Sequence, residues 1–411
     1  MRDPVIRILR GDVLDRLDAL RAEGARFHVI VTSPPYFALR IYEGAAPRAW
    51  PEITYVPMWG LAPVTVPAME VSLGLEPTPE AFVAHLVHVF RRACPLLRED
   101  GALWLDLGDS YANDAKRCTG LPSKQMLGIP WRVAFALQAD GWTLRSAPPW
   151  IRTNAMPDST DDRPGNAHEQ FFFLTRNPRY FYDADAVRLP AREARSRNTA
   201  RTHGRDYGRV EAHRGANVPW QDDGRGRHRR TVDWFLESAA AGEAEGLIHA
   251  SDVDPSIAPD DDAPRALVVR NRPHPGKHSA TYPEPLVAPC LRASTSARGC
   301  CAACGAPWRR VVEGVGWEPG CACGADTVPC RALDPFGGTG TTAATALRLG
   351  LDCDLIEVDP SCLPEIDARL ARARAARAQR ALDVDAVPAA PSLPAEPRPA
   401  ATQVALPLES R

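Results

Sequence analysis

The chain lacks the features that would place it in a membrane or outside the cell. None of its apolar runs reaches the roughly 18 residues that a membrane-spanning helix needs. Its first residues also lack the charged and then apolar pattern of a secretory leader. We therefore expect a cytoplasmic protein with no membrane partner. The eleven cysteines are then expected to be reduced thiols or metal ligands rather than disulfides.

The chain also lacks an excess of charge of either sign. It has 49 Lys and Arg residues against 51 Asp and Glu residues, with a net charge of −2. Any contact with a nucleic acid must therefore come from local basic patches rather than from the charge of the whole protein. Its 411 residues are enough for one large α/β domain with insertions or for two smaller domains.

A glycine-rich stretch near the C-terminus lacks the marks of a phosphate-binding loop. Residues 334–342 read Asp-Pro-Phe-Gly-Gly-Thr-Gly-Thr-Thr, no Lys follows Gly340, and Ala343 replaces the third glycine of a dinucleotide fingerprint. What remains is Phe-x-Gly-x-Gly after an apolar strand, with Glu357 closing the next predicted strand. This layout is typical of a nucleoside cofactor site in an open α/β sheet, where glycines admit a bulky ligand beside a helix N-terminus.

A second short stretch lies near the other end of the chain and reads Thr32-Ser33-Pro34-Pro35-Tyr36. The two prolines fix a stiff turn. Ser33 and a backbone carbonyl can accept hydrogen bonds from an exocyclic amine, and Tyr36 offers a ring for stacking. Alone, such a stretch is equally consistent with a simple turn. Its significance comes from its combination with the glycine loop.

The pattern of apolar residues predicts alternating strands and helices. Thr78-Pro79 is a helix start, and the residues that follow place apolar side chains on one helical face. We expect strands at 101–107 and 352–357, a helix at 341–349 that ends at Gly350, and a long Arg/Ala-rich helix from about Ser361. This alternation predicts an α/β fold with a mainly parallel, Rossmann-like sheet and helices on both faces.

Several ordered segments together resemble one family. The chain is similar to site-specific DNA methyltransferases that act on exocyclic amines of adenine or cytosine, in the permuted beta arrangement with the catalytic motif before the cofactor motif. The resemblance covers roughly residues 5 to 372 and rests on the two stretches above and on Gly11-Asp12, residues 27–31, 103–111, 128–132, 162–175 and 277–283.

The resemblance implies S-adenosyl-L-methionine as cofactor and double-stranded DNA as substrate, with a cognate restriction endonuclease as a further partner. It implies that the target base flips out of the duplex, because its amine cannot be reached inside the helix. The implied catalytic residues are Ser33, Pro34, Pro35 and Tyr36. The implied cofactor-binding residues are Asp12, Asp334, Phe336, Gly338, Gly340, Thr341 and Glu357. Asp12 is also a candidate helix N-cap.

The target base is less well specified. Ser before Pro-Pro-Tyr is commoner in the cytosine enzymes of this family than in the adenine enzymes, so the resemblance slightly favours cytosine N4 over adenine N6.

A cysteine cluster indicates a metal. Cys301-x2-Cys304 and Cys321-x-Cys323 are spaced so that two tight turns can present four thiolates to one zinc ion. We therefore predict a closed, structural zinc knuckle that orders the loop before the cofactor strand. Cys300 and Cys330 are spare candidates that could replace one ligand. The alternative is a set of free buried thiols.

The regular pattern disappears between residues 189 and 270. Arginine outnumbers acidic residues from 191 to 230, and His and aromatic residues are interleaved. This segment is either a solvated disordered insert or the target-recognition region, since Arg pairs with phosphates and reads guanine. The predicted units are a catalytic half (1–188), the insert (189–270), a pre-cofactor segment (271–297), the zinc knuckle (298–330), a cofactor-loop half (331–382) and a disordered Pro/Ala-rich tail (383–411).

Other functions account for fewer of these features. Pro289-Cys290 and Pro329-Cys330 contain the dipeptide of ring-carbon cytosine methylases, but both precede the glycine loop, which is the wrong order. Methylases of RNA or protein with a related turn place the cofactor loop first. A non-catalytic zinc-containing DNA-binding protein with a decayed methylase body would not be expected to retain both motifs.

Overall fold

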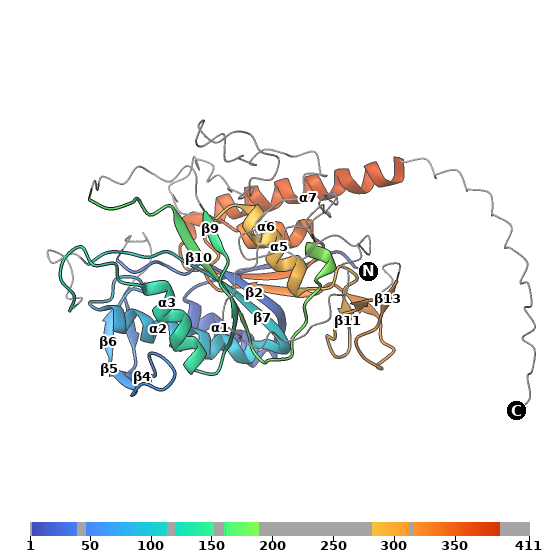
Figure 1. Ribbon diagram of the computed structural model, residues 1–411. Helices are drawn as coiled ribbons and strands as arrows, with labels where there is room; N and C mark the ends of the chain where they lie inside the picture. The colour runs from blue at the N-terminus through green and yellow to red at the C-terminus, as the bar shows by residue number, and fades with distance from the viewer. Residues whose placement is uncertain are drawn as a thin grey trace, which may run out of the picture.

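The computed structural model describes residues 2–38, 47–112, 120–151, 160, 162–188, 282–311 and 316–386 (Figure 1). The predicted recognition insert (189–270) lies outside these residues, as do residues 271–281 and 387–411. Within the described part of the chain, no helix combines the length and the apolar character needed to cross a bilayer.

An eight-stranded sheet forms the centre of the molecule. Five neighbouring strands are parallel. The next strand, β10, runs antiparallel beside β7 and pairs with two short edge strands. The prediction of a mainly parallel sheet is confirmed, although the sheet is mixed at one side. In spatial order the strands are β1 (Ile6–Arg10), β16 (Asp352–Glu357), β15 (Arg331–Asp334), β2 (Phe27–Thr32), β7 (Leu97–Leu107), β10 (His168–Thr175) and β8 (Thr143–Ser146), with β9 (Pro149–Ile151) also paired to β10.

Helices cover both faces of the sheet, as predicted (Figure 1). Along β2 the side chains alternate, so Ile30 packs into one core and its neighbours Val29 and Val31 into the other. Burial on both faces explains why this strand is apolar throughout. The first face carries α1 (Val13–Ala22), α2 (Pro79–Ala93) and α3 (Ile129–Ala139), and the second carries α5 (Glu284–Ser294), α6 (Thr341–Arg348) and α7 (Leu363–Ala386).

The helix boundaries agree closely with the sequence signals. Thr78 caps α2 by accepting a hydrogen bond from the Ala81 amide at 3.2 Å, and Pro79 takes the first helical position. β16 has the predicted bounds, while α7 continues to Ala386, past the boundary predicted at residue 382. Single 3-10 turns occur at Cys94–Leu96, Asp185–Val187 and Pro360–Cys362.

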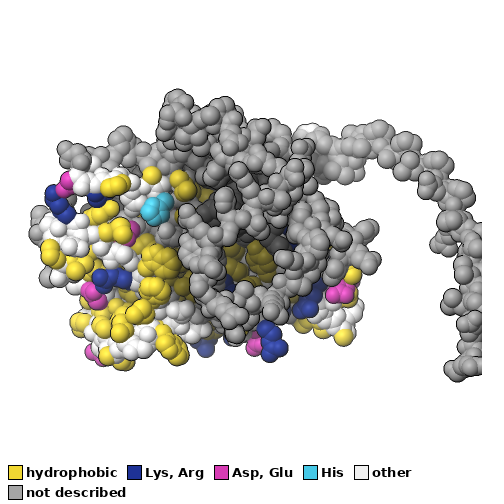
Figure 2. All heavy atoms as spheres, in the orientation of Figure 1, with side chains coloured by type: hydrophobic (Ala, Val, Ile, Leu, Met, Phe, Trp, Pro, Cys, Tyr) yellow, Lys and Arg dark blue, Asp and Glu magenta, His cyan; other side chains and the backbone are white. Residues whose placement is uncertain are grey.

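A small β insertion between β2 and α2 was not predicted. It consists of two two-stranded sheets, β3 (Arg48–Trp50) with β6 (Met69–Val71) and β4 (Ile53–Tyr55) with β5 (Val64–Val66). Its strands are three residues each, too short to give a clear alternating pattern in the sequence. Figure 2 shows apolar side chains gathered over this part of the molecule, and Trp59 in the β4–β5 connection is 77% exposed.

The Cys-rich segment is also built from short strands. β11 (Cys300–Cys301) pairs with β14 (Thr327–Val328), and β12 (Arg309–Arg310) pairs with β13 (Trp317–Glu318). This segment lies directly before β15, the strand that leads into the glycine loop.

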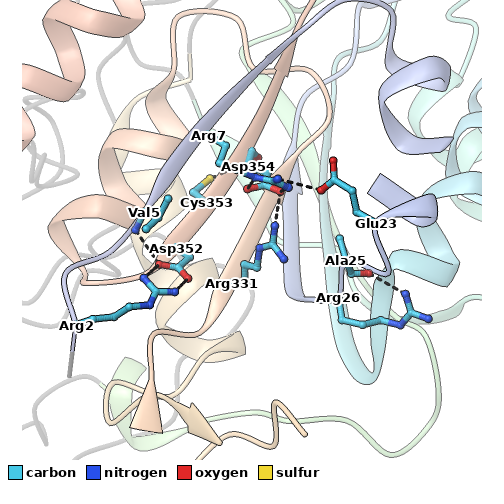
Figure 3. A network of polar contacts seen from close by, with 10 residues as sticks. All are labelled: Arg2, Val5, Arg7, Glu23, Ala25, Arg26, Arg331, Asp352, Cys353 and Asp354. Atoms are coloured by element: carbon cyan, nitrogen blue, oxygen red, sulfur yellow. Dashed lines mark hydrogen bonds and ion pairs between the residues drawn. The ribbon is translucent and has the colours of Figure 1, made fainter. Parts of the chain in front are cut away.

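A network of ion pairs joins three neighbouring strands (Figure 3). The buried carboxylate of Asp354 on β16 accepts two hydrogen bonds from Arg7 on β1, at 3.0 and 2.6 Å, and one from Arg331 on β15 at 2.8 Å. Arg7 also pairs with Glu23 at the end of α1. Burial of charge is tolerated here because Asp354 is paired on both sides.

Candidate active site

The candidate site lies at the carboxyl ends of four adjacent parallel strands. From β15 the chain crosses through α6 to β16 on one side, whereas from β2 it crosses through α2 to β7 on the other. These two crossovers place α6 and α2 on opposite faces, so the loops after β15 and β2 diverge and leave a crevice. One cavity lies there, lined by residues of the segments that follow or end these four strands. The segments are 11–13 at β1, 33–35 at β2, 335–341 at β15 and 356–359 at β16.

The glycine loop keeps its shape through close backbone contacts. A Cβ atom on Gly337 would lie 2.3 Å from the Leu355 side chain, so only glycine fits between the loop and β16. The Gly338 amide donates to Glu357 Oε2 at 2.6 Å, and the Asp359 amide donates to Glu357 Oε1 at 2.7 Å. Phe336, Gly338 and Glu357, three of the predicted cofactor-binding residues, all line the cavity.

Asp334 anchors the glycine loop. It is buried beneath the loop, where it accepts hydrogen bonds from the Thr32 hydroxyl at 2.7 Å, the Phe336 amide at 3.1 Å and the Tyr282 hydroxyl at 3.0 Å. Desolvation raises its pKa. Asp334 is therefore an anchor that joins β2, β15 and Tyr282. Its side chain does not line the cavity, and its part in cofactor binding stays a prediction.

Gly340 and Thr341 start α6. Gly340 is the N-cap residue with φ +80°, and a Cβ atom there would lie 3.1 Å from the Ile366 side chain of α7. Its role is thus a backbone turn packed on α7, whereas Thr341 lines the cavity and accepts a hydrogen bond from Arg369 at 2.8 Å.

Asp12 is the predicted N-cap of α1, and its role in cofactor binding stays a prediction. Its side chain caps α1 by accepting from the Leu14 amide at 2.8 Å, and it also lines the cavity. The Gly11 amide donates to the Glu357 carbonyl at 2.9 Å, which brings the two acidic residues to the same wall. Arg48 from the β insertion pairs with Asp12 and lines the cavity as well.

The Pro-Pro turn opens into the same cavity. Ser33 and Pro35 line it, while Pro34 is buried and Tyr36 is partly buried behind them. The Ser33 hydroxyl donates to the Tyr36 hydroxyl at 3.3 Å, and the Tyr36 hydroxyl lies 2.5 Å from Glu169 Oε2 and 3.1 Å from Asp106 Oδ2. Burial, Asp106 and Glu169 all raise the pKa of Tyr36, so its hydroxyl stays protonated and donates.

Several residues at this site were not predicted to be functional. Asp106, near the end of β7, and Glu169, near the start of β10, meet because the two strands are antiparallel with Gln170 opposite Leu107. Arg48, Trp50 and Tyr282 also line the cavity. Asp106 is recognisable in the sequence as a single acid in an apolar strand, but no local pattern sets the register of β10.

The four predicted zinc ligands come together. The Sγ atoms of Cys301, Cys304, Cys321 and Cys323 all lie within 4.8 Å of one another. Backbone amides of residues 303 and 304 lower the pKa of the Cys301 thiol to about 7, whereas its cysteine neighbours raise the pKa of Cys323 to about 12. Four crowded thiols of this kind match the donor set of a structural zinc ion.

Cys300 and Cys330 belong to a different cluster. They lie with His28 in the core. His28 Nε2 forms a hydrogen bond with the Gly305 carbonyl at 2.9 Å, and His28 Nδ1 accepts one from the Arg331 amide at 3.0 Å. Both ring nitrogens are thus engaged by the backbone. His28 joins β2 to the Cys-rich segment and to β15, and the four-cysteine set does not need either spare thiol.

The fold and the paired loops define a class of α/β enzymes that bind a nucleoside cofactor at the carboxyl ends of parallel strands. A family model described as DNA methylase, for enzymes acting at adenine N6 and cytosine N4, matches residues 27–367. The chain belongs to this family and is a DNA amino-methyltransferase.

Known relatives cover most of the chain. It is similar to the type II methyltransferase M.XycI of Xanthomonas campestris pv. cyanopsidis, with 32% identity over 81% of this chain and 79% of the relative. It is also similar to M.Cfr9I of Citrobacter freundii, with 31% identity over 86% and 83%. Among solved structures, the cytosine-N4-specific PvuII DNA methyltransferase aligns over 92% of this chain and 95% of its own, with 14% identity and a TM-score of 0.45.

Proposed function

We propose that this protein transfers a methyl group from S-adenosyl-L-methionine to the exocyclic amine of a flipped base within a specific DNA sequence. The observation that carries the proposal is that the Ser33 turn and the Phe-Gly-Gly-Thr-Gly loop line one cavity. A nucleophile held at one wall can therefore meet a methyl donor held at the other.

The cavity wall suits the proposed cofactor. Phe336 offers a ring face for the adenine, Glu357 a carboxylate for the ribose hydroxyls, and Gly338 a backbone with no atom within 4 Å of an added Cβ. In the described part of the chain, the buried Thr339 hydroxyl on this wall has no hydrogen-bond partner. A polar ligand would satisfy it.

In this reaction the protein must orient an aryl amine toward the methyl group of the cofactor. The cofactor supplies an electrophilic methyl group on a sulfonium. The lone pair of the amine is delocalised into the base, so hydrogen bonds from the amine to Ser33 Oγ and to the Pro34 carbonyl would localise it and direct it toward the methyl group. The Tyr36 ring would hold the flipped base by stacking. The attack would be in-line, without a covalent enzyme intermediate.

Three finer assignments accompany this proposal. The serine before Pro-Pro-Tyr favours cytosine N4 as the target. The similarity to type II methyltransferases supports a protective role beside a restriction endonuclease. The Arg-rich segment 189–270 is assigned to target recognition, because Arg contacts both phosphates and guanine.

Ser33→Ala tests the catalytic assignment. Alanine fits the same turn, so a purely structural Ser33 predicts nearly unchanged turnover. If Ser33 orients the amine, single-turnover methyl transfer to duplex DNA should fall by a factor on the order of 10 to 1000 while cofactor affinity is retained. Ser146→Ala, on the edge strand β8, is the matched control.

Modification-sensitive sequencing of DNA from cells that express the protein would identify the base and its sequence, and unmodified DNA would refute the proposal.

A further inference from the structure

The hydrogen bonds around Tyr36 form a chain that runs in one direction. Ser33 Oγ donates to Tyr36 at 3.3 Å, and Tyr36 donates to Glu169 Oε2 at 2.5 Å. The first oxygen lies on the cavity wall, and the last belongs to a carboxylate that is only 7% exposed. Because the Ser33 proton points along the chain toward Tyr36, the lone pairs of Ser33 Oγ are left to accept from a ligand.

A methylated amine must lose a proton. When the amine nitrogen of a base forms its bond to the methyl carbon, it becomes cationic unless one of its two protons departs. An aryl amine is weakly basic, so removing the proton as the bond forms also makes the nitrogen a better nucleophile. Ser33 on the cavity wall is an acceptor for that proton, but a serine hydroxyl is not a base unless it passes its own proton on.

We propose that Glu169 is the terminal proton acceptor of the methyl transfer, reached through Ser33 and Tyr36. This inference rests on the proposed function, since it requires an amine bound at Ser33. Glu169 does not itself contact the amine, and neither Ser33 nor Tyr36 carries a net charge at the end of the transfer.

Bonds and protons balance in this transfer. The nitrogen–carbon bond forms while the carbon–sulfur bond breaks, and the electron pair of the broken bond stays on sulfur as a neutral thioether. One amine proton moves to Ser33 Oγ, the Ser33 proton moves to the Tyr36 oxygen, and the Tyr36 proton moves to Glu169. The products are a neutral methylamine and a protonated Glu169 carboxyl.

Two carboxylates surround the Tyr36 hydroxyl, and the geometry favours Glu169. Its oxygen is 2.5 Å from the hydroxyl, whereas the Asp106 oxygen is 3.1 Å away. Asp106 on β7 is 1% exposed, whereas Glu169 at the start of β10 is 7% exposed. Glu169 is therefore better placed to return the proton to water after each turnover.

Two substitutions break the chain while they keep the Tyr36 ring and the shape of the Glu169 side chain. Glu169→Gln keeps an oxygen that can accept from Tyr36 but removes its basicity. Tyr36→Phe keeps the stacking face and removes the relay oxygen. We expect each to lower single-turnover methyl transfer roughly 100-fold or more, within the range of general acid–base catalysis. Tyr55→Phe, a buried tyrosine of the β insertion, is the matched control.

Two further readouts separate proton transfer from structure. Duplex DNA with 2-aminopurine at the target position should show the same flipping fluorescence and affinity in wild type, Glu169→Gln and Tyr36→Phe. The wild-type rate should fall non-linearly with the deuterium content of the solvent, because several protons move together, and Glu169→Gln should abolish that curvature. Melting temperatures identify a variant that fails to fold, in which case the other variant carries the test.

Each remaining outcome has a defined meaning. A near-normal rate in folded Glu169→Gln or Tyr36→Phe overturns the relay. Loss of activity in Asp106→Asn together with normal activity in Glu169→Gln also overturns it, because the proton then goes to Asp106. Wild-type protein that methylates no duplex rejects the proposed function itself, whereas a methylating wild type with an unaffected Glu169→Gln rejects only the relay.

Discussion

The Glu357 carboxylate accepts a hydrogen bond from the Gly338 amide, with 2.6 Å between the two atoms. Glu357 ends β16 and Gly338 lies in the loop after β15, so one side chain bridges two neighbouring strand ends. Because Glu357 also lines the cavity, it both shapes the glycine loop and faces the ligand. Its carboxylate thus holds the loop, and in the proposed function the same carboxylate binds the ribose.

Glu357→Ala should weaken binding of S-adenosyl-L-methionine by about 1.5–3 kcal/mol or more, because it removes a charged acceptor and leaves the amides of Gly338 and Asp359 without it. Glu357→Gln keeps one acceptor oxygen and should have a smaller effect. Titration calorimetry measures both, with the half-exposed Glu23→Ala as control. Equal affinities in wild type and Glu357→Ala would show that the cofactor binds elsewhere.

Phe336→Ala tests a second residue of the proposed cofactor wall. Removing the ring should weaken cofactor binding by about 1–3 kcal/mol, the usual contribution of stacking between a base and an aromatic side chain. The same calorimetric titration applies, and Phe336→Tyr, which keeps the ring face, should bind nearly normally. A variant without the ring that binds as tightly as wild type would contradict the assignment of Phe336 to the adenine.

Gly340→Val should disturb the loop from below. Gly340 has φ +80°, and its added side chain would meet Ile366 on α7. We expect lower thermal stability and weaker cofactor binding in the same variant. Ile366→Ala in the Gly340→Val background should restore part of the lost thermal stability, because it relieves the clash. The part lost to backbone strain at Gly340 should remain. A fully stable Gly340→Val would refute this account.

The sequence predicted the fold where patterns are local. The Thr78 cap, the strand at 352–357 and the glycine at the start of α6 are short-range signals, and all three are found. The β insertion was missed because its three-residue strands have no readable periodicity. The antiparallel direction of β10 was not predicted, because strand direction depends on pairing between distant segments.

The candidate site was predictable to the same extent. Ser33 and Glu357 belong to motifs, and each lines the cavity. Asp334 belongs to a motif too, yet its position beneath the loop depends on Thr32 and Tyr282, which are far away in sequence. Glu169 reaches Tyr36 only through the register of two strands. Contacts of this kind require the tertiary structure.

Asp354→Ala should cost about 1.5–3 kcal/mol of unfolding free energy, because it leaves the partly exposed Arg7 and Arg331 without their shared buried carboxylate. Urea denaturation followed by circular dichroism measures the loss. Asp18→Ala, which removes a half-exposed carboxylate paired with Arg92, should cost no more than about 1 kcal/mol and serves as the control. Equal, small losses in both variants would show that the network in Figure 3 adds little to stability.

The cysteine cluster leads to the last prediction, one zinc ion per chain. Four thiols within 4.8 Å of one another repel as thiolates, and a divalent cation removes that repulsion. Metal analysis of the purified protein should therefore find one equivalent, and Cys304→Ser should retain less, whereas Cys94→Ser, outside the cluster, should retain it all.

Removing the zinc should also destabilise the cofactor loop. The segment that holds the four cysteines leads directly into β15, and its Gly305 carbonyl is bonded to His28 of the central sheet. A chelator should thus lower the melting temperature and weaken cofactor binding together, since the energy of a structural zinc ion goes into folding. Metal-free protein whose four thiols titrate freely in the native state, at an unchanged melting temperature, would show instead that the cluster folds as reduced cysteines.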